Sequence, residues 1–115
     1  MTTIPVLILG TTYHLKFGTH EELELTTEVD GDCNYYSKVI RVRSDLFFGS
    51  DDKTDEELLI ARREVLAHEI THAFFHEAGL DGYGTDEVLV DWIALMLSRL
   101  TESVEKAFSE LLDKG

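Results

Sequence analysis

The chain has 115 residues and a formal net charge of −13, because 23 acidic side chains outnumber 10 basic ones. This length suits a single domain spanning residues 1–115, and a hydrophobic content of 43% argues against intrinsic disorder. The negative charge repels phosphate and disfavours direct binding to nucleic acid. A single cysteine, Cys33, excludes an internal disulfide and a multi-cysteine zinc site, and we expect it to pack as a small hydrophobic residue.

Neither a membrane span nor a secretion signal is predicted. The longest apolar stretch, residues 88–97, is interrupted by Asp91 and is shorter than the roughly 20 residues that a helix needs to cross a bilayer. The apolar run at 4–9 contains Pro5 and follows no basic residue, so it is a poor secretion signal. We therefore expect a cytoplasmic protein that does not contact membranes.

The beginning of the chain predicts a β-hairpin. Residues 6–9 and 13–17 are rich in β-forming side chains and flank the segment 10–12, Gly-Thr-Thr, which is typical of a turn. Residues 21–29 alternate only weakly, so we expect a loop or an irregular strand there.

A second hairpin is predicted around Ser37 and Lys38. Residues 33–36 and Val39–Arg43 flank these two, and Val39–Arg43 is the clearest strand of the chain. We expect a small, mainly antiparallel sheet of three or four strands. We expect Val39–Arg43 to be an edge strand, with which an extended peptide could pair.

The second half of the chain predicts helices. A polar break at 50–53 precedes Thr54, which forms a capping box with Glu57. Apolar residues at helical spacing continue this helix to Gly79, which suits the position after a helix end.

Two further helices are predicted after a glycine-containing loop at 81–85. The helix at 85–99 is apolar almost all round, so we expect it to be central and buried. Residues 101–112 form a third, amphipathic segment. The fold class is therefore α+β, with the sheet packed on two or three helices.

The strongest chemical signal is an H-E-x-x-H sequence, from His68 to His72, inside the first predicted helix. Residues four apart lie on one helical face, about 6 Å apart along the axis. Two neutral imidazoles so placed can bind one Zn²⁺ at about 2.0–2.1 Å. Glu69 lies beside them and is the candidate general base that takes a proton from water. The sequence therefore predicts a catalytic zinc site with His68 and His72 as ligands.

His76 continues the histidine series but is not expected on the metal. Eight residues of straight helix separate it from His68 by about 12 Å, whereas two nitrogen ligands of one zinc lie at most about 4.2 Å apart. A place at the rim of the pocket is one interpretation. A solvated or packed histidine is the simpler one.

A third protein ligand must come from further along the chain. The acidic candidates are Asp81, Asp86, Glu87 and Asp91. A carboxylate at Asp91 in a buried helix needs a partner, and Glu87 lies one turn before it on the same face. We therefore expect Glu87 to bind the metal and Asp91 to accept a hydrogen bond from a ligating imidazole. The alternatives are Asp91 as the ligand with Glu87 exposed, or Glu87 as an acid that only favours the helix start.

The combined pattern resembles the ImmA/IrrE-type zinc metallopeptidases. The resemblance rests on H-E-x-x-H with a further histidine four residues on, followed after a short loop by Glu87-x-x-x-Asp91-x-Ile93-Ala94-x-x-Leu97. Residues 30–42 are also similar to the hairpin of short, phage-encoded members. One position departs from the pattern: Thr71 stands where the family often has glycine, a change that a helix tolerates.

This resemblance implies a minimal zincin-like fold in which His68, His72 and Glu87 bind Zn²⁺ and Glu69 is the general base. It also implies a protease that cleaves a protein or peptide, such as a repressor-type regulator, in the host cytoplasm if a phage encodes the chain. A group besides the metal must stabilise the oxyanion. The available candidates are His76, Tyr35, Tyr36 and Tyr83.

Two other functions are open at this point. The chain could be a metal-stabilised binding module that acts on a host protein without cleaving it. It could also be an acidic decoy that occupies a nucleic-acid-binding protein, although acidic residues spread along the chain are expected for solubility alone. Partner binding by a decoy should survive chelation and weaken steeply with salt.

Overall fold

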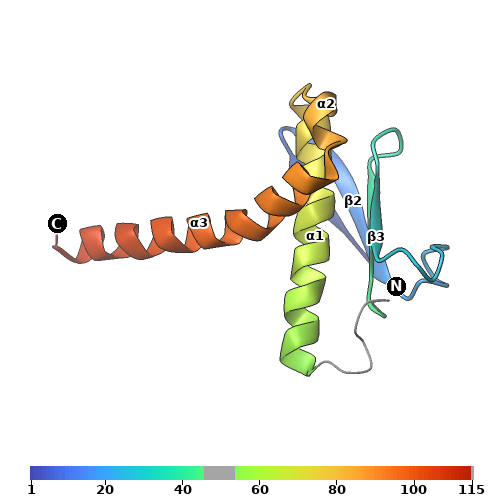
Figure 1. Ribbon diagram of the computed structural model, residues 1–115, viewed down its shortest axis with the longest axis horizontal. Coiled ribbons are helices and arrows are strands. Elements are labelled where there is room, and N and C mark those ends of the chain that lie inside the picture. Colours follow the sequence, from blue (N-terminus) through green and yellow to red (C-terminus); the bar gives the residue numbers. More distant parts are fainter. Residues whose placement is uncertain (46–53, 115) are drawn as a thin grey trace.

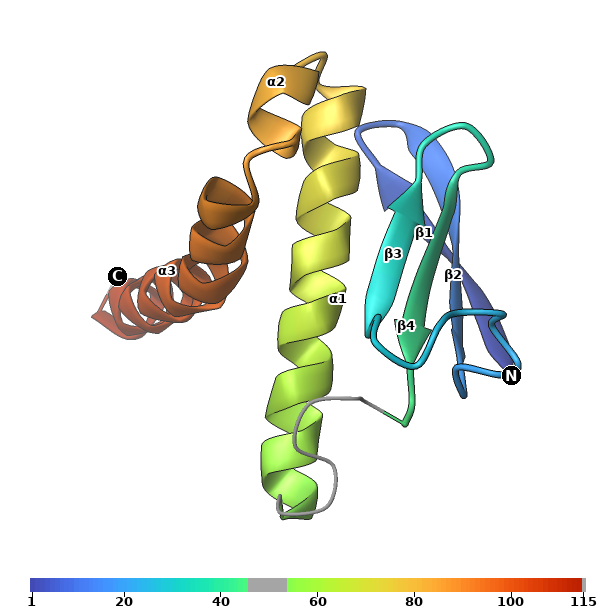
Figure 2. The ribbon, with the colours of Figure 1, turned by 45° about the vertical axis from the view of Figure 1, so that its right-hand side comes forward.

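The computed structural model describes residues 1–45 and 54–114 and shows an α+β fold, with four strands and three helices among these residues. The polar break predicted at 50–53 lies outside the described residues. Helix α1 (Asp55–Glu77) packs on one face of the sheet, and α3 (Glu87–Lys114) contacts α1 on its other side (Figures 1 and 2). The predicted combination of a small sheet with two or three helices is confirmed.

The first two strands form a hairpin whose turn lies earlier than predicted. β1 (Thr2–Ile8) pairs antiparallel with β2 (Thr11–Gly18), and Leu9 and Gly10 form the turn with φ of 46° and 85°. Positive φ at both turn residues matches the twist of a two-residue hairpin. β1 lies at an edge of the sheet, where a strand tolerates a proline such as Pro5.

The sheet order is β1-β2-β4-β3, in which β3 (Gly31–Asn34) and β4 (Val39–Arg43) form the second predicted hairpin. β2 and β4 run parallel, so the sheet is mixed but mostly antiparallel. The prediction that Val39–Arg43 is an edge strand is wrong, because β4 pairs on both sides and buries Ile40 and Val42 in the core. Residues 21–29 contain turns and no strand.

Helix α1 begins and ends as the sequence predicts. The Thr54 hydroxyl accepts a hydrogen bond of 3.2 Å from the Glu57 amide, which is the N-cap interaction of the capping box. Gly79 adopts φ of 75°, the left-handed conformation typical of the residue after a helix end. Buried side chains from α1 and the sheet form one core, which contains Ile8, Tyr13, Leu15, Ile40, Val42 and Ala73.

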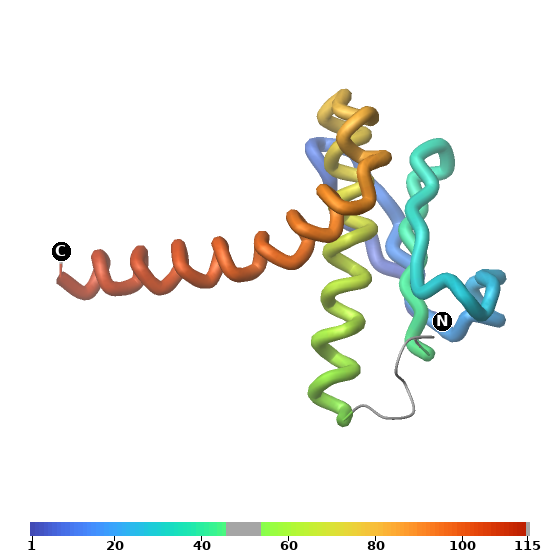
Figure 3. Tube along the Cα trace, in the orientation of Figure 1, coloured from blue at the N-terminus to red at the C-terminus, as the bar shows by residue number. Residues whose placement is uncertain are grey.

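The chain beyond α1 differs from the prediction in two ways. The loop expected at 81–85 contains a short helix, α2 (Asp81–Gly84). The helices expected at 85–99 and 101–112 are one continuous helix, α3, which Figure 3 shows without a break. Neither glycine nor proline lies between the two predicted segments, so nothing in the sequence stops the helix there.

The prediction that the helix after α1 is central and buried is also wrong. Val90 and Ala94 are buried, whereas Val88 and Trp92 are 81% and 60% exposed. Only a narrow side of α3 touches α1, and its C-terminal half projects away from the body of the protein (Figure 1). Even so, no helix among the described residues is long and apolar enough to cross a bilayer.

Candidate metal centre

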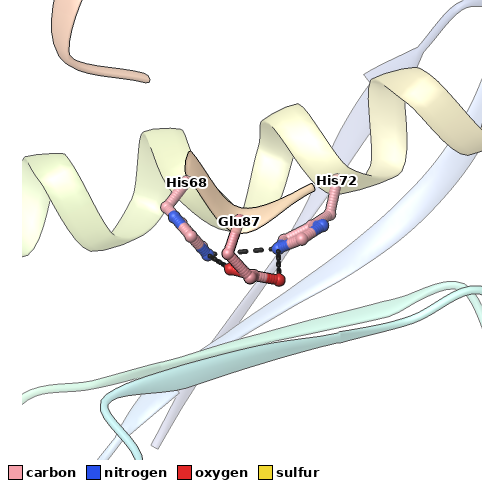
Figure 4. A group of neighbouring side chains, drawn as sticks. All are labelled: His68, His72 and Glu87. Carbon is pink, nitrogen blue, oxygen red and sulfur yellow. Dashed lines mark hydrogen bonds and ion pairs between the residues drawn. The ribbon is translucent and has the colours of Figure 1, made fainter. Parts of the chain in front are cut away.

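His68 and His72 lie one turn apart on α1, and their imidazoles converge (Figure 4). The two Nε2 atoms are 3.1 Å apart, on the side of α1 where β3 passes it. The four-residue spacing on a straight helix is sufficient to produce this placement. The structure therefore brings together the two histidines that the sequence predicts to share a site.

Glu87 completes a group of three. Its carboxylate lies across both imidazoles, with Oε2 3.0 Å from Nε2 of His68 and Oε1 3.2 Å from Nε2 of His72. Glu87 is the first residue of α3, which begins there because Asp86 accepts a hydrogen bond of 3.1 Å from the Leu89 amide. One ligand atom from each of the three residues lies within 4.8 Å of the others, so this group could hold a metal ion.

A hydrogen bond on the far side of each imidazole defines its tautomer. Nδ1 of His72 lies 2.7 Å from the carbonyl oxygen of Gly84, and Nδ1 of His68 lies 2.6 Å from Oδ1 of Asp91. Because both oxygens only accept, each neutral ring carries its proton on Nδ1 and directs an Nε2 lone pair toward Glu87. The contact expected between Asp91 and an imidazole is present.

With both rings in the neutral form that binds metal, three groups that bear lone pairs face one another without a hydrogen between them. Two neutral Nε2 atoms cannot hydrogen-bond to each other, and the carboxylate of Glu87 only accepts. A cation between them satisfies all three groups. Tetrahedral Zn²⁺ holds neighbouring ligand atoms about 3.3 Å apart. The two Nε2 atoms are 3.1 Å apart, and Glu87 approaches them with a different oxygen each, Oε2 at 3.0 Å and Oε1 at 3.2 Å. Two imidazoles and one carboxylate are a donor set of catalytic zinc, with one position left for water.

Glu69 is buried beside this group. The residue is 5% exposed, its Oε1 lies 3.9 Å from Nε2 of His68, and its Oε2 has no hydrogen-bond partner among the described residues. Burial and the negative charges of Asp32 and Glu87 raise the pKa of Glu69 from 4.5 to about 8. A cation held by the three ligands acts in the opposite direction and favours the carboxylate form. An unpartnered carboxylate next to an open coordination position suits a general base.

The group borders an open depression of about 340 Å³ between α1 and β3. Because β3 is an edge strand, one side of the depression is a strand with an unpaired edge. Cys33 lines it as a half-buried thiol, and burial together with nearby Glu69 and Asp32 raises the pKa of that thiol to about 12. The lining residues are Gly31, Asp32, Cys33, Tyr35, His68, Glu69, His72 and Glu87.

His76 lies one turn beyond His72 and is not part of the metal-binding group. Its Nδ1 lies 2.7 Å from Oδ1 of Asp81, and its ring stacks on Tyr35, with centroids 4.4 Å apart and planes 5° apart. Asp81, an acidic candidate for the third ligand, therefore hydrogen-bonds to His76. Tyr35 lines the depression, and burial is the main cause that raises its pKa. The stacked pair lies at the rim of the site, where the sequence interpretation allowed His76 to be.

The other two tyrosines considered for the oxyanion do not line the depression. Tyr36 lies in the turn between β3 and β4 and is 97% exposed. Tyr83 lies on α2, is 58% exposed and stacks on Phe75 with ring centroids 6.2 Å apart. Of the four candidates, Tyr35 and His76 are therefore the two at the rim.

Two contributions to the site are missing from the sequence interpretation. The carbonyl oxygen of Gly84 orients His72, and a backbone atom leaves no sequence signal. Asp32 borders the depression and lies opposite Arg41 in the β3–β4 hairpin, with its Oδ1 2.8 Å from Nε of Arg41. Opposite charges at facing positions of a predicted hairpin are the signal that could have found this pair.

Comparison with known proteins adds no assignment, since no family model, curated protein or solved structure matches the chain. The resemblance to ImmA/IrrE-type peptidases stays a prediction from the sequence. The function proposed below therefore depends on the geometry of the site.

Proposed function

We propose that this chain is a zinc-dependent endopeptidase of minimal zincin-like architecture. His68, His72 and Glu87 hold the metal, and Glu69 is the general base. One observation carries the proposal: two imidazoles and a carboxylate converge beside the buried Glu69, whose Oε2 has no partner among the described residues, in a depression open to a substrate. The family resemblance of the sequence implies the same ligands and the same base, and so supports the proposal.

The residues of the site divide the chemical tasks among them. Zn²⁺ bound in such a site lowers the pKa of water toward about 7 and polarises a carbonyl. Glu69 accepts the proton of the attacking water and passes it to the leaving amine. Asp91 keeps the Nε2 lone pair of His68 aimed at the ligand position. Tyr35 and His76, at the rim, are the candidates for stabilising the oxyanion.

The edge strand β3 indicates the class of substrate. Its open side borders the same depression as Glu69 and the three proposed ligands. An extended peptide can add to an unpaired strand edge through main-chain hydrogen bonds. The substrate is therefore a protein or peptide with an extended segment, and a repressor-type regulator is the substrate that the sequence resemblance implies.

Metal content tests the proposed ligands. Wild-type protein loaded with zinc and dialysed should hold one zinc per chain by elemental analysis, whereas His72→Ala should hold almost none. Glu69→Gln should retain the zinc, because Glu69 is the base and not a ligand. Glu64→Gln, the same change at an exposed position of α1, is the matched control and should behave as wild type.

Hydrolysis tests the role of Glu69. Zinc-loaded protein is incubated with a peptide library of random sequence, and new termini are identified by mass spectrometry. Glu69→Gln should reduce cleavage by about 10²–10⁴-fold, the usual contribution of a positioned general base. Undiminished cleavage by this variant removes Glu69 from that role. A zinc-loaded wild type that binds peptides but cuts none supports the metal-stabilised binding module instead.

A further inference from the structure

The C-terminal half of α3 is an arm without a partner among the described residues. Every residue from Arg99 to Lys114 is exposed, and the arm projects from the body of the protein (Figures 1 and 3). The arm continues a helix whose first half packs on α1, so it needs no nucleus of its own. Most helices in proteins are nevertheless stabilised by packing of an apolar face, and a contact along that face would stabilise the arm.

Seven apolar residues of α3, between Val90 and Leu111, follow a seven-residue repeat. Successive members lie alternately three and four residues apart, which is the spacing of a coiled-coil seam. The first member, Val90, is fully buried, while Leu97, Leu100, Val104 and Leu111 are 52–68% exposed. We call this set the α3 seam; its members are Val90, Ile93, Leu97, Leu100, Val104, Ala107 and Leu111. The seam that begins buried inside the fold thus continues along the exposed arm.

The charges of α3 lie away from the seam. Positions flanking a coiled-coil seam usually carry the charges that select a partner. Here the flanking residues contain a single charge, Glu110, although the whole chain carries a net charge of −13. A second copy of this acidic chain can therefore approach along the seam without opposing like charges. The flanking positions are Ala94, Met96, Thr101, Ser103, Phe108 and Glu110.

An apolar hollow extends the same surface onto α1. It has a volume of about 560 Å³. Seam residues Ile93 and Leu97 line it from α3, and Leu66, Ile70 and Phe74 are among the residues that line it from α1. The apolar surface is thus continuous from the body of the protein to the arm. Soluble monomeric proteins rarely expose a large contiguous apolar patch, and such a patch often marks a site of interaction with another protein.

We propose that the α3 seam is a self-association surface, through which two copies of the chain form a symmetric dimer. In such a dimer the exposed seam residues of one copy pack against the seam residues of the other, and the charged residues of the arm face water. A symmetric pair closes on itself, because the same patch is used by both copies. The metal-binding residues are not part of the seam, so this proposal is independent of the peptidase activity.

Sedimentation equilibrium of the full chain tests the dimer. At loading concentrations from about 1 to about 100 µM, which bracket a micromolar Kd, the mass should rise from 13.1 kDa toward twice that value. Circular dichroism over the same concentrations should show a helix content that increases with the fraction of dimer. A single-chain mass across the whole range overturns the proposal.

Two adjacent leucines provide a matched pair of variants. Leu111 belongs to the seam and Leu112 does not, although their exposed fractions are 68% and 65%. Leu111→Glu and Val104→Glu should raise the dimer Kd by about 30-fold or more, because each places a charge in the apolar contact that the dimer buries. Leu112→Glu should leave the Kd within a few-fold of wild type.

The remaining outcomes are equally decisive. Equal weakening by Leu111→Glu and Leu112→Glu overturns the seam in favour of unspecific apolar contact. A dimer that survives Val104→Glu also overturns it. Zinc content at the wild-type value shows that a weakened variant is folded around its site, since the site uses residues of α1 and the start of α3.

Discussion

The two histidines of the site are oriented by partners of different kinds. His72 is held by the carbonyl oxygen of Gly84, which is buried, whereas His68 is held by Asp91, whose side chain is 71% exposed. An exposed carboxylate keeps most of its hydration and still defines the tautomer of the ring. The orientation of His68 therefore depends on a side chain that can be replaced without disturbing the core.

We expect Asp91→Ala to weaken metal binding without abolishing it. Loss of the acceptor leaves the His68 ring free to rotate or change tautomer, and loss of such partners typically costs about 10–100-fold in metal affinity. Asp91→Asn keeps an acceptor oxygen and should recover much of the loss. Competition with a chromophoric zinc chelator measures both, and Asp113→Ala, at an exposed position far along α3, is the control.

The zinc affinities of Asp91→Ala and Glu87→Ala, compared with each other, show which of the two acids is the metal ligand. If Glu87 is the ligand, its removal should reduce affinity more than Asp91→Ala does. A larger loss at Asp91 instead contradicts the assignment and supports the alternative in which Asp91 binds the metal directly. The contacts of Glu87 with both Nε2 atoms favour the first outcome.

At the scale of elements, the site depends on how closely β3 passes α1. A Cβ placed on Gly31 would lie 2.8 Å from the Arg41 carbonyl oxygen, 3.0 Å from Cγ1 of Val65 and 3.3 Å from Cγ of Glu69. Backbone and a helix side chain cannot both withdraw, so the strand itself must move. The absence of a side chain at Gly31 therefore lets β3 form the wall of the depression beside Glu69.

We expect Gly31→Ala to destabilise the fold by roughly 1–3 kcal/mol, the usual cost of overpacking a close contact. Displacement of β3 should also lower any peptidase activity. Gly82→Ala is the matched control, because a Cβ there meets no atom within 4 Å. Urea unfolding measures both variants. A Gly31→Ala protein as stable as the control contradicts the close approach of β3 to α1.

Local signals in the sequence were sufficient for the parts of the site that lie on one element. The spacing of His68 and His72 determines their convergence, and Thr54 and Gly79 mark the ends of the helix that carries them. Glu87 was chosen because it lies one turn before Asp91 on the same helical face, although the burial expected for Asp91 is wrong, since its side chain is 71% exposed. These features depend on contacts within a few residues, which the sequence states directly.

Features that depend on distant pairing were not predictable in the same way. The pattern of Val39–Arg43 indicates a strand but not its neighbours, so its place inside the sheet was missed. The apolar side chains of Trp92 and Leu95 suggested burial, yet only one side of α3 meets another element. The proposed seam accounts for other exposed apolar residues of α3, such as Leu100 and Val104, but not for Trp92 and Leu95.

At the scale of the whole molecule, one carboxylate joins the sheet to the end of α1. Oε1 of Glu77 accepts hydrogen bonds from the Tyr13 hydroxyl at 2.9 Å and from Nζ of Lys38 at 2.7 Å. Its Oε2 accepts from Thr11 at 3.2 Å. Tyr13 is fully buried in the core, so this network connects β2 and the β3–β4 turn to the helix that carries the metal ligands.

The ionisation of Glu77 should therefore appear in the pH dependence of stability. The hydrogen bond from Lys38, followed by that from Tyr13, holds the pKa of Glu77 below its ordinary value of 4.5. For a carboxyl with a lowered pKa in the folded state, the stabilisation is complete above 4.5 and is lost as pH falls through the folded-state pKa. Protonated Glu77 is nearly isosteric with glutamine, so Glu77→Gln mimics the low-pH state.

Urea unfolding of wild type and Glu77→Gln from about pH 7 down to about pH 3 tests this, since the range spans the titration of a carboxyl. Wild type should be the more stable at neutral pH, and the two free energies of unfolding should converge as Glu77 is protonated. Glu64→Gln, at an exposed position of the same helix, should follow wild type throughout. A gap between wild type and Glu77→Gln that stays constant with pH would show that the network acts by shape alone, and that the charge on Glu77 does not hold the sheet and helix together.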